Sequence, residues 1–149
     1  MPETNLERSK TLCITNDFGP RAGGIETFVI GLIQRMPKNS VIVYTASQEG
    51  SKPFDAMWLR DYGVEVIRDS AKVLLPSFRV DRNVRKLVRE RNIKSAFFGA
   101  AAPLALLAPG LRTTGVKRIV ALTHGHEVWW SRLWPFSWAI ARIACAVDS

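Results

Sequence analysis

The sequence contains two cysteines and no long hydrophobic run. Cys13 and Cys145 lie far apart, which excludes a disulfide-rich secreted scaffold and is typical of a reducing compartment. The longest uncharged stretch, residues 95–111, includes two prolines and is shorter than the roughly 18 apolar residues that a membrane-spanning helix requires. The first ten residues have no apolar core, so we predict no signal peptide and a cytoplasmic protein.

The two familiar phosphate-binding glycine motifs are also absent, since neither G-x-G-x-x-G nor G-x-x-x-x-G-K-[ST] occurs. The chain has instead the stretch NDFGPRAGGIETFVIGLIQRM over residues 16–36, in which Gly23 and Gly24 directly precede a predicted helix. A helix N-terminus offers unpaired N–H donors and a partial positive charge, which would suit an anion. A tight strand-to-helix turn would use glycines equally well, and the local sequence leaves both interpretations open.

The net charge of +8 is concentrated in one segment. Residues 79–94 contain seven basic and two acidic residues, so this segment carries +5 of the total. Its apolar residues recur with helical period, which predicts an amphipathic helix with basic residues largely on the remaining faces. A concentrated basic patch indicates an anionic surface or ligand.

Short uncharged runs rich in β-branched residues alternate with segments of helical period. The predicted strands are residues 11–15, 41–46, 64–68, 95–99 and 118–124. An apolar stripe over residues 25–36 predicts a helix that buries this stripe, and further helices are predicted at 104–111 and 133–146. This order predicts an α/β fold with an open parallel sheet and helices on both faces.

Ligands of open parallel sheets bind at the carboxyl ends of the strands. Three loops are predicted to meet there: NDFGPRAGG after the first strand, GAAAP after the fourth and HGHEVWW after the fifth. The third loop contains both histidines of the chain, His124 and His126, next to Glu127. A metal site would lack an obvious third ligand, so we predict no metal. His124 would then bond to backbone or donate a hydrogen bond to a polar substrate.

Three blocks of the sequence together resemble a known family: ITNDFGPRAGGIETF, PSFRVDRNVRKLVRERNIKSAFFGAAAPLALLAP and ALTHGHEVWWSRL. They are similar to family 4 retaining glycosyltransferases of the GT-B fold, and most of all to actinobacterial phosphatidylinositol mannosyltransferases that use GDP-mannose. The resemblance implies that residues 1–149 form the Rossmann-like N-terminal domain, which takes the acceptor. It also implies a C-terminal nucleotide-sugar domain with a Glu-x7-Glu motif, which does not occur in this sequence.

The resemblance implies roles for four residues near the predicted strand ends. Gly23 and Gly24 match a glycine pair that approaches the donor diphosphate, and His124 matches a histidine that contacts the donor sugar. Asp17 matches an acidic position near the acceptor hydroxyl. GDP-mannose is a substrate here, no cofactor is expected, and the chain by itself is expected to be inactive. In a retaining transfer, the leaving phosphate can take the acceptor proton.

The basic helix matches a membrane-contact helix near the entry of the lipid acceptor. The implied contacts with an anionic membrane or the acceptor are Arg79, Arg82, Arg85, Lys86 and Arg89, which would place the enzyme on the inner face of the cell membrane. Aromatic residues of the interfacial type follow at Trp129, Trp130, Trp134, Phe136 and Trp138. A solvated helix face that keeps the domain soluble is the alternative interpretation of the basic residues.

Two other classes of protein fit parts of the pattern. A stand-alone binding module of flavodoxin-like type would need no second domain. A nucleic-acid binder would explain the charge, but the basic patch lies on one helix without an RNP-like aromatic motif or helix-turn-helix spacing. We therefore predict no nucleic-acid partner.

Overall fold

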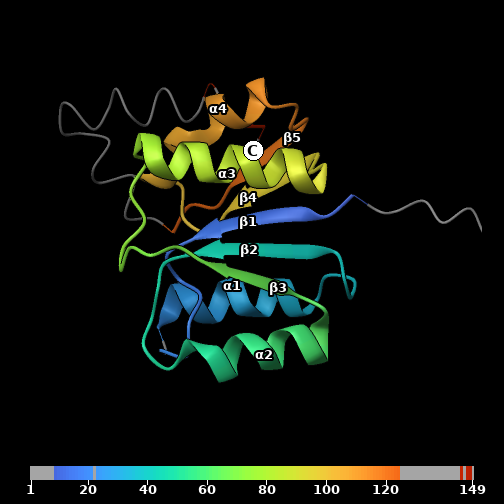
Figure 1. The fold of residues 1–149 in the computed structure, drawn as a ribbon, viewed down its shortest axis with the longest axis vertical. Coiled ribbons are helices and arrows are strands. Elements are labelled where there is room, and N and C mark those ends of the chain that lie inside the picture. Colours follow the sequence, from blue (N-terminus) through green and yellow to red (C-terminus); the bar gives the residue numbers. More distant parts are fainter. Residues whose placement is uncertain (1–8, 22, 125–144, 146, 149) are drawn as a thin grey trace, which may run out of the picture.

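The computed structural model describes residues 9–21, 23–124, 145 and 147–148. These residues form a five-stranded sheet in the order β3-β2-β1-β4-β5, in which every neighbouring pair is parallel (Figure 1). The strands are β1 Thr11–Thr15, β2 Val41–Thr45, β3 Glu65–Arg68, β4 Ser95–Phe98 and β5 Arg118–Ala121. All five predicted strands are confirmed, although β5 ends before the predicted residues 122–124.

The central strands are the most apolar because helices cover them on both sides. Every residue of β2 is buried, as are the last four residues of β1, whereas the edge strand β3 is half-buried throughout. In register, Thr11 lies beside Val41 of β2 and Ser95 of β4. An uncharged, β-branched sequence thus corresponds to burial on both faces, as expected for a parallel sheet.

Helices cover both faces of the sheet (Figure 1). The helices are α1 Gly24–Gln34, α2 Ser51–Tyr62, α3 Phe78–Arg91, the 3-10 helix η1 Leu104–Leu107 and α4 Ala108–Thr113. Figure 1 shows α1 and α2 on one face and α3 and α4 on the other, and each face has its own hydrophobic cluster. The predicted α/β architecture is confirmed, and it is Rossmann-like.

Helix α2 was not predicted from the sequence because its apolar periodicity is weak. Trp58 is its one buried residue, and the helix is bounded by Gly50 and Gly63, both in the left-handed conformation with φ of 73° and 64°. Glycine adopts this conformation without the steric penalty that a side chain brings. The signal for α2 was therefore in its flanking glycines and not in an apolar stripe.

The predicted burial of the stripe over residues 25–36 is only partly correct. Val29 and Ile33 are buried on α1, but the Phe28 side chain is 54% exposed. Its ring packs against the imidazole of His124, with centroids 5.6 Å apart, instead of entering the core. The apolar periodicity identified the helix correctly. It did not show that Phe28 packs against a loop residue and not in the core.

Helix α3 follows the sequence prediction closely. Val80, Val84, Leu87 and Val88 are buried, and the Ser77 hydroxyl accepts a hydrogen bond from the N–H of Val80 at 3.3 Å. Such an N-cap satisfies one of the free donors of the first turn. The amphipathic helix therefore packs its apolar stripe on the sheet and directs most of its basic residues outward.

Candidate functional site

An open cavity of about 750 Å³ lies at the carboxyl ends of the strands. The loop after β1 contributes Asp17, Gly23 and Gly24, while Gln48 comes from the loop after β2 and Lys72 from the loop after β3. The sequence predicts a site formed by the loops after β1, β4 and β5. The loops after β2 and β3 were missed because they contain no glycine cluster or histidine.

Gly23 and Gly24 lie in the wall of this cavity, where the sequence placed a possible anion site. Gly23 is the N-cap of α1 in an extended conformation, and no side chain caps this helix end. A Cβ on Gly24 would have no atom within 4 Å, whereas one on Gly23 would lie 3.0 Å from Oε2 of Glu26. The N-terminus of α1 is therefore open to the cavity, and Gly23 leaves room for the neighbouring carboxyl group.

Asp17 is held at the end of β1 by its own backbone. Its N–H donates a hydrogen bond of 2.9 Å to Oγ1 of Thr15, a fully buried residue. Burial raises the pKa of Asp17 above its usual range, while the nearby His124 acts in the opposite direction. The side chain thus stands in a partly desolvated environment within reach of the charge on His124.

Glu26 is a second carboxyl group in the cavity wall and was missed as a site residue. It is 8% exposed, and its pKa is raised first by burial and then by the charge of Asp17, with Arg21 opposing the shift. Its position three residues after the N-cap, in the sequence Gly-Gly-Ile-Glu, was the available signal. Asp17 and Glu26 therefore share the cavity with the open end of α1.

His124 lies at the other side of the β1 end, next to the loop that follows β4. Its Nε2 is 2.6 Å from the carbonyl oxygen of Gly99, and the Phe28 ring meets its imidazole at an interplanar angle of 82°. The loops after β1, β4 and β5 therefore converge as predicted. His126 and Glu127 lie outside the described residues, and within the described ranges no three potential ligands are grouped to hold a metal ion.

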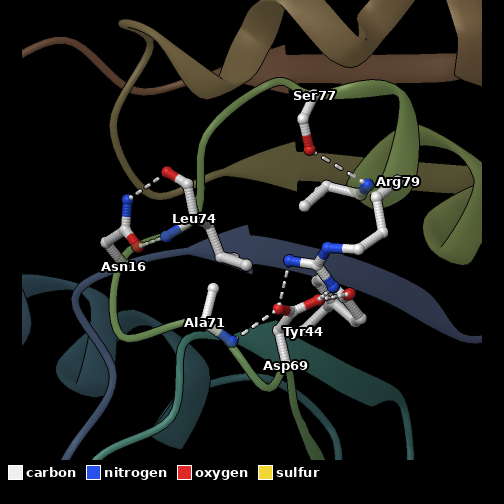
Figure 2. A network of polar contacts seen from close by, with 8 residues as sticks. Asn16, Tyr44, Asp69, Ala71, Leu74, Ser77 and Arg79 are labelled. Carbon is white, nitrogen blue, oxygen red and sulfur yellow. Dashed lines mark hydrogen bonds and ion pairs between the residues drawn. The ribbon is translucent and has the colours of Figure 1, made fainter.

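The basic residues of α3 differ in their surroundings. Arg79 forms two hydrogen bonds with the buried carboxylate of Asp69, at 2.7 and 2.9 Å (Figure 2). The Tyr44 hydroxyl and the N–H of Ala71 also donate to this carboxylate. The Arg79 hydrogen bonds, helped by the other two donors, hold the pKa of Asp69 well below its usual range. Burial and the bond to Asp69 raise the pKa of Tyr44 to about 12.

The other four basic residues of the predicted set face outward to different degrees. Arg85 is 2.9 Å from Asp81, and Lys86 is 3.7 Å from Glu90, each pair one helical turn apart. Arg82 and Arg89 are exposed, and neither forms an ion pair with any other residue in the described ranges. Of these basic residues, Arg79 therefore binds a buried carboxylate, and Arg85 and Lys86 pair with acidic residues of the same helix. Arg82 and Arg89 face solvent.

An exposed apolar group accompanies these cations and was missed by the sequence reasoning. Val73 and Leu75, in the segment joining β3 to α3, are 60% and 59% exposed, and Phe78, the first residue of α3, is 91% exposed. Between them, Leu74 is buried, and Asn16 bonds to both its N–H and its carbonyl at 2.7 and 3.1 Å (Figure 2). This anchoring of Leu74 fixes the position of its exposed neighbours Val73 and Leu75, and Phe78 follows at the start of α3.

The tryptophan-rich stretch, with Trp129, Trp130, Trp134, Phe136 and Trp138, lies outside the described residues. Among the helices that the structure describes, none has the length and apolar character needed to cross a bilayer. The membrane-related predictions therefore depend on the surface features of α3 and the segment before it.

No protein-family model matches the chain. It is 41% identical over 143 residues to a "GDP-mannose-dependent alpha-(1-6)-phosphatidylinositol monomannoside mannosyltransferase" of Mycobacterium tuberculosis strain CDC 1551, covering 94% of this chain and 37% of the relative. The enzyme of that name from Mycolicibacterium smegmatis is 39% identical over 92% of this chain and 36% of its own. A Corynebacterium glutamicum enzyme, named for a monoacylated form of that acceptor, is 38% identical over 93% and 36%.

The parallel sheet with an open helix end at its carboxyl edge is a Rossmann-like α/β architecture. Identity of 38–41% over nearly the whole chain makes it a homologue of actinobacterial GDP-mannose-dependent phosphatidylinositol mannosyltransferases. The resemblance inferred from the three sequence blocks is thereby confirmed. The chain spans about a third of the length of these relatives.

Proposed function

We propose that this chain is the N-terminal, acceptor-side half of a retaining GT-B glycosyltransferase. The full-length protein would transfer mannose from GDP-mannose to a phosphatidylinositol mannoside lipid. The observation that supports this proposal most strongly is the cavity at the carboxyl edge, where Asp17 and the uncapped glycine end of α1 share one wall. The names of the homologues, which cover 92–94% of this chain, supply the substrate class.

Gly23 and Gly24 would receive the diphosphate of GDP-mannose. The first-turn N–H groups of α1 have no side-chain cap, and a helix N-terminus favours negative charge. The absence of a Cβ on Gly24 leaves the approach to these donors open. The negative charge of Glu26 opposes an anion in this place, and the nearby positive charge of Arg21 reduces that repulsion.

Asp17 would orient the acceptor hydroxyl, and His124 would contact the transferred mannose. Both side chains lie at the end of β1 or beside it, so a sugar held between them would reach the diphosphate at α1. The leaving phosphate would take the acceptor proton. The enzyme would use GDP-mannose as a substrate and would need no resident cofactor or metal.

The full-length protein would work at the cytoplasmic face of the membrane as a peripheral protein. Arg82, Arg89 and the first residue, Phe78, are exposed on α3, and Val73 and Leu75 are exposed in the segment before it. Basic side chains attract anionic headgroups, and apolar side chains beside them can enter the interfacial layer. Arg79, which is bonded to Asp69, would serve this contact less than its neighbours.

The decisive experiment measures mannose transfer from GDP-mannose to phosphatidylinositol monomannoside by the full-length protein. We expect transfer with retention at the anomeric carbon, and a large loss of turnover in Asp17→Asn. Asp61→Asn is the matched control, because Asp61 pairs with Arg60 on the surface of α2. Absence of transfer by the wild-type protein, or equal activity of the two variants, would contradict the proposal.

A further inference from the structure

We infer that Phe28 and Gly99 are positioning residues for His124. They hold its imidazole in one orientation and in the tautomer that carries the proton on Nε2. The tautomer follows from the contacts alone, whereas its importance for turnover rests on the proposed function. The three residues come from α1, the loop after β4 and the loop after β5, so the fold brings them together.

The contact with Gly99 determines the tautomer. A carbonyl oxygen can only accept a hydrogen bond, and Nε2 of His124 lies 2.6 Å from it. Nε2 must therefore carry the proton, and the neutral ring then has its lone pair on Nδ1. Any group that bonds to the neutral ring at Nδ1 has to be a donor. Of the two roles that the sequence left open for His124, the bond to backbone is present, and a hydrogen bond donated to substrate would require a second proton on the ring, at Nδ1.

The backbone at Gly99 is so close to β1 that no larger residue fits at this position. A Cβ on Gly99 would lie 2.5 Å from Oγ1 and 2.8 Å from Cβ of Thr15, both in a fully buried residue. The N–H of Gly99 also donates to the carbonyl of Ile14 at 3.0 Å. The same Thr15 hydroxyl accepts the N–H of Asp17, so one junction between β1 and β4 sets the positions of Asp17 and His124.

Phe28 restrains the imidazole from the side of α1. The ring centroids are 5.6 Å apart at an angle of 82°, an edge-to-face arrangement that aromatic pairs prefer. Phe28 lies four residues after Gly24, and residues at this spacing share one face of a helix. Helix α1 therefore brings its open N-terminus and the support for His124 to the same part of the site.

The first experiment observes the tautomer directly. The full-length protein is labelled with 15N-histidine, and the His124 signals are identified by their loss in His124→Gln. Proton–nitrogen correlation spectra at about pH 8.5, where an ordinary imidazole is neutral, show which ring nitrogen carries the proton. We expect the proton on Nε2. A proton on Nδ1, or a mixture with Nδ1 as the larger population, would overturn the inference.

The second experiment removes the aromatic support. Phe28→Ala is expected to mix the tautomers and to lower kcat for mannose transfer on the order of tenfold, with a smaller change in the KM for GDP-mannose. Phe28→Tyr keeps the ring and should retain most of the activity. Leu59→Ala is the control, because Leu59 on α2 is 58% exposed, close to the 54% of Phe28. If Phe28→Ala matches Leu59→Ala in spectrum and kcat, Phe28 has no positioning role.

The two proposals fail in different ways. Normal mannose transfer by His124→Ala would refute the role of His124 in turnover, while the tautomer measurement would stand. A wrong tautomer would refute the positioning of His124 even if His124→Ala were inactive.

Discussion

Helices α1 and α3 both begin at the carboxyl edge of the sheet, but their N-termini are built differently. The first turn of α3 is capped by the Ser77 hydroxyl, whereas α1 begins at Gly23 with no side-chain cap. The acidic residue in the first turn of α3, Asp81, pairs with Arg85, while Glu26 of α1 faces the cavity. A helix end closed by its own side chains serves the fold, and one left open is available to a ligand.

The same contrast occurs within α3. Arg79 and Arg82 lie three residues apart, carry the same charge and are both exposed, yet only Arg79 is bonded to the buried Asp69. Charge counted along a sequence therefore overestimates the charge available to a partner. The predictions below test the difference between the open α1 site and the α3 surface.

The largest expected effect is at the α1 site. His124→Ala in the full-length protein should lower turnover on the order of 10²-fold or more, because a contact that orients the transferred sugar is lost. Initial rates of mannose transfer measure this change, and circular dichroism verifies that the fold is kept. Near-normal transfer by a well-folded variant would leave His124 a purely structural residue.

The next effect concerns the exposed cations of α3. Replacing Arg82 and Arg89 by Ser should weaken binding of the 149-residue chain to anionic vesicles by roughly 30-fold, at about 1 kcal/mol for each residue. Co-sedimentation with anionic vesicles, neutral vesicles and single-stranded oligonucleotides at one ionic strength near physiological measures the preference. Tighter binding to oligonucleotides, or unchanged partitioning of the variant, would refute the membrane contact.

Arg79 provides the matched comparison for that experiment. Arg79→Gln removes one positive charge from the same helix, but it also breaks the bonds to Asp69. We expect it to destabilise the fold more than Arg82→Gln and to reduce vesicle binding less. The opposite ranking would return Arg79 to the membrane-facing set.

A moderate effect on stability is expected at Asp69. Asp69→Asn should lower the free energy of unfolding by about 2 kcal/mol, because several hydrogen bonds to a buried charged group are weakened. Asp81→Asn, at a half-exposed pair, should cost no more than about 0.5 kcal/mol. Urea unfolding of the chain at neutral pH measures both. Equal losses would mean that the Asp69 cluster contributes nothing beyond a surface pair.

The Asp69 effect should also depend on pH in one direction. Its folded-state pKa is lowered, so its contribution is fully present above the unfolded pKa of about 4 and is lost as pH falls through the folded value. The stability difference between the wild-type chain and Asp69→Asn should therefore shrink in acid below about pH 4. A constant difference would exclude this carboxylate as the cause.

The smallest expected effect is at Glu26. Glu26→Gln removes a negative charge beside the open end of α1 and should lower the KM for GDP-mannose two- to threefold, roughly the size of a helix-dipole interaction. Glu49→Gln is the control, since Glu49 lines the same cavity from the loop after β2. An equal change in both variants would show a general charge effect and no special role for the helix end.

Much of the fold could be predicted from the sequence because its signals are local. Short apolar runs identified all five strands, and apolar periodicity identified α1 and α3. The stretch around Gly23 and Gly24 and the loop at His124 were also found, because glycine pairs and lone histidines are visible without a structure. Helix α2 was missed where this periodicity was weak.

What the sequence determined by itself is the order of strands and helices along the chain and the edge of the sheet at which the loops after β1, β4 and β5 converge. Only the tertiary structure decided which side chains meet there. Tyr44, Asp69 and Arg79 come from β2, the end of β3 and α3, and Phe28 meets His124 across nearly a hundred residues. Hydrogen bonds and ring contacts depend on distance and angle between segments, and residue periodicity specifies neither. The sequence therefore predicted a basic patch, and only the folded chain showed that Arg79 binds a buried carboxylate whereas Arg82 and Arg89 form no ion pair within the described residues.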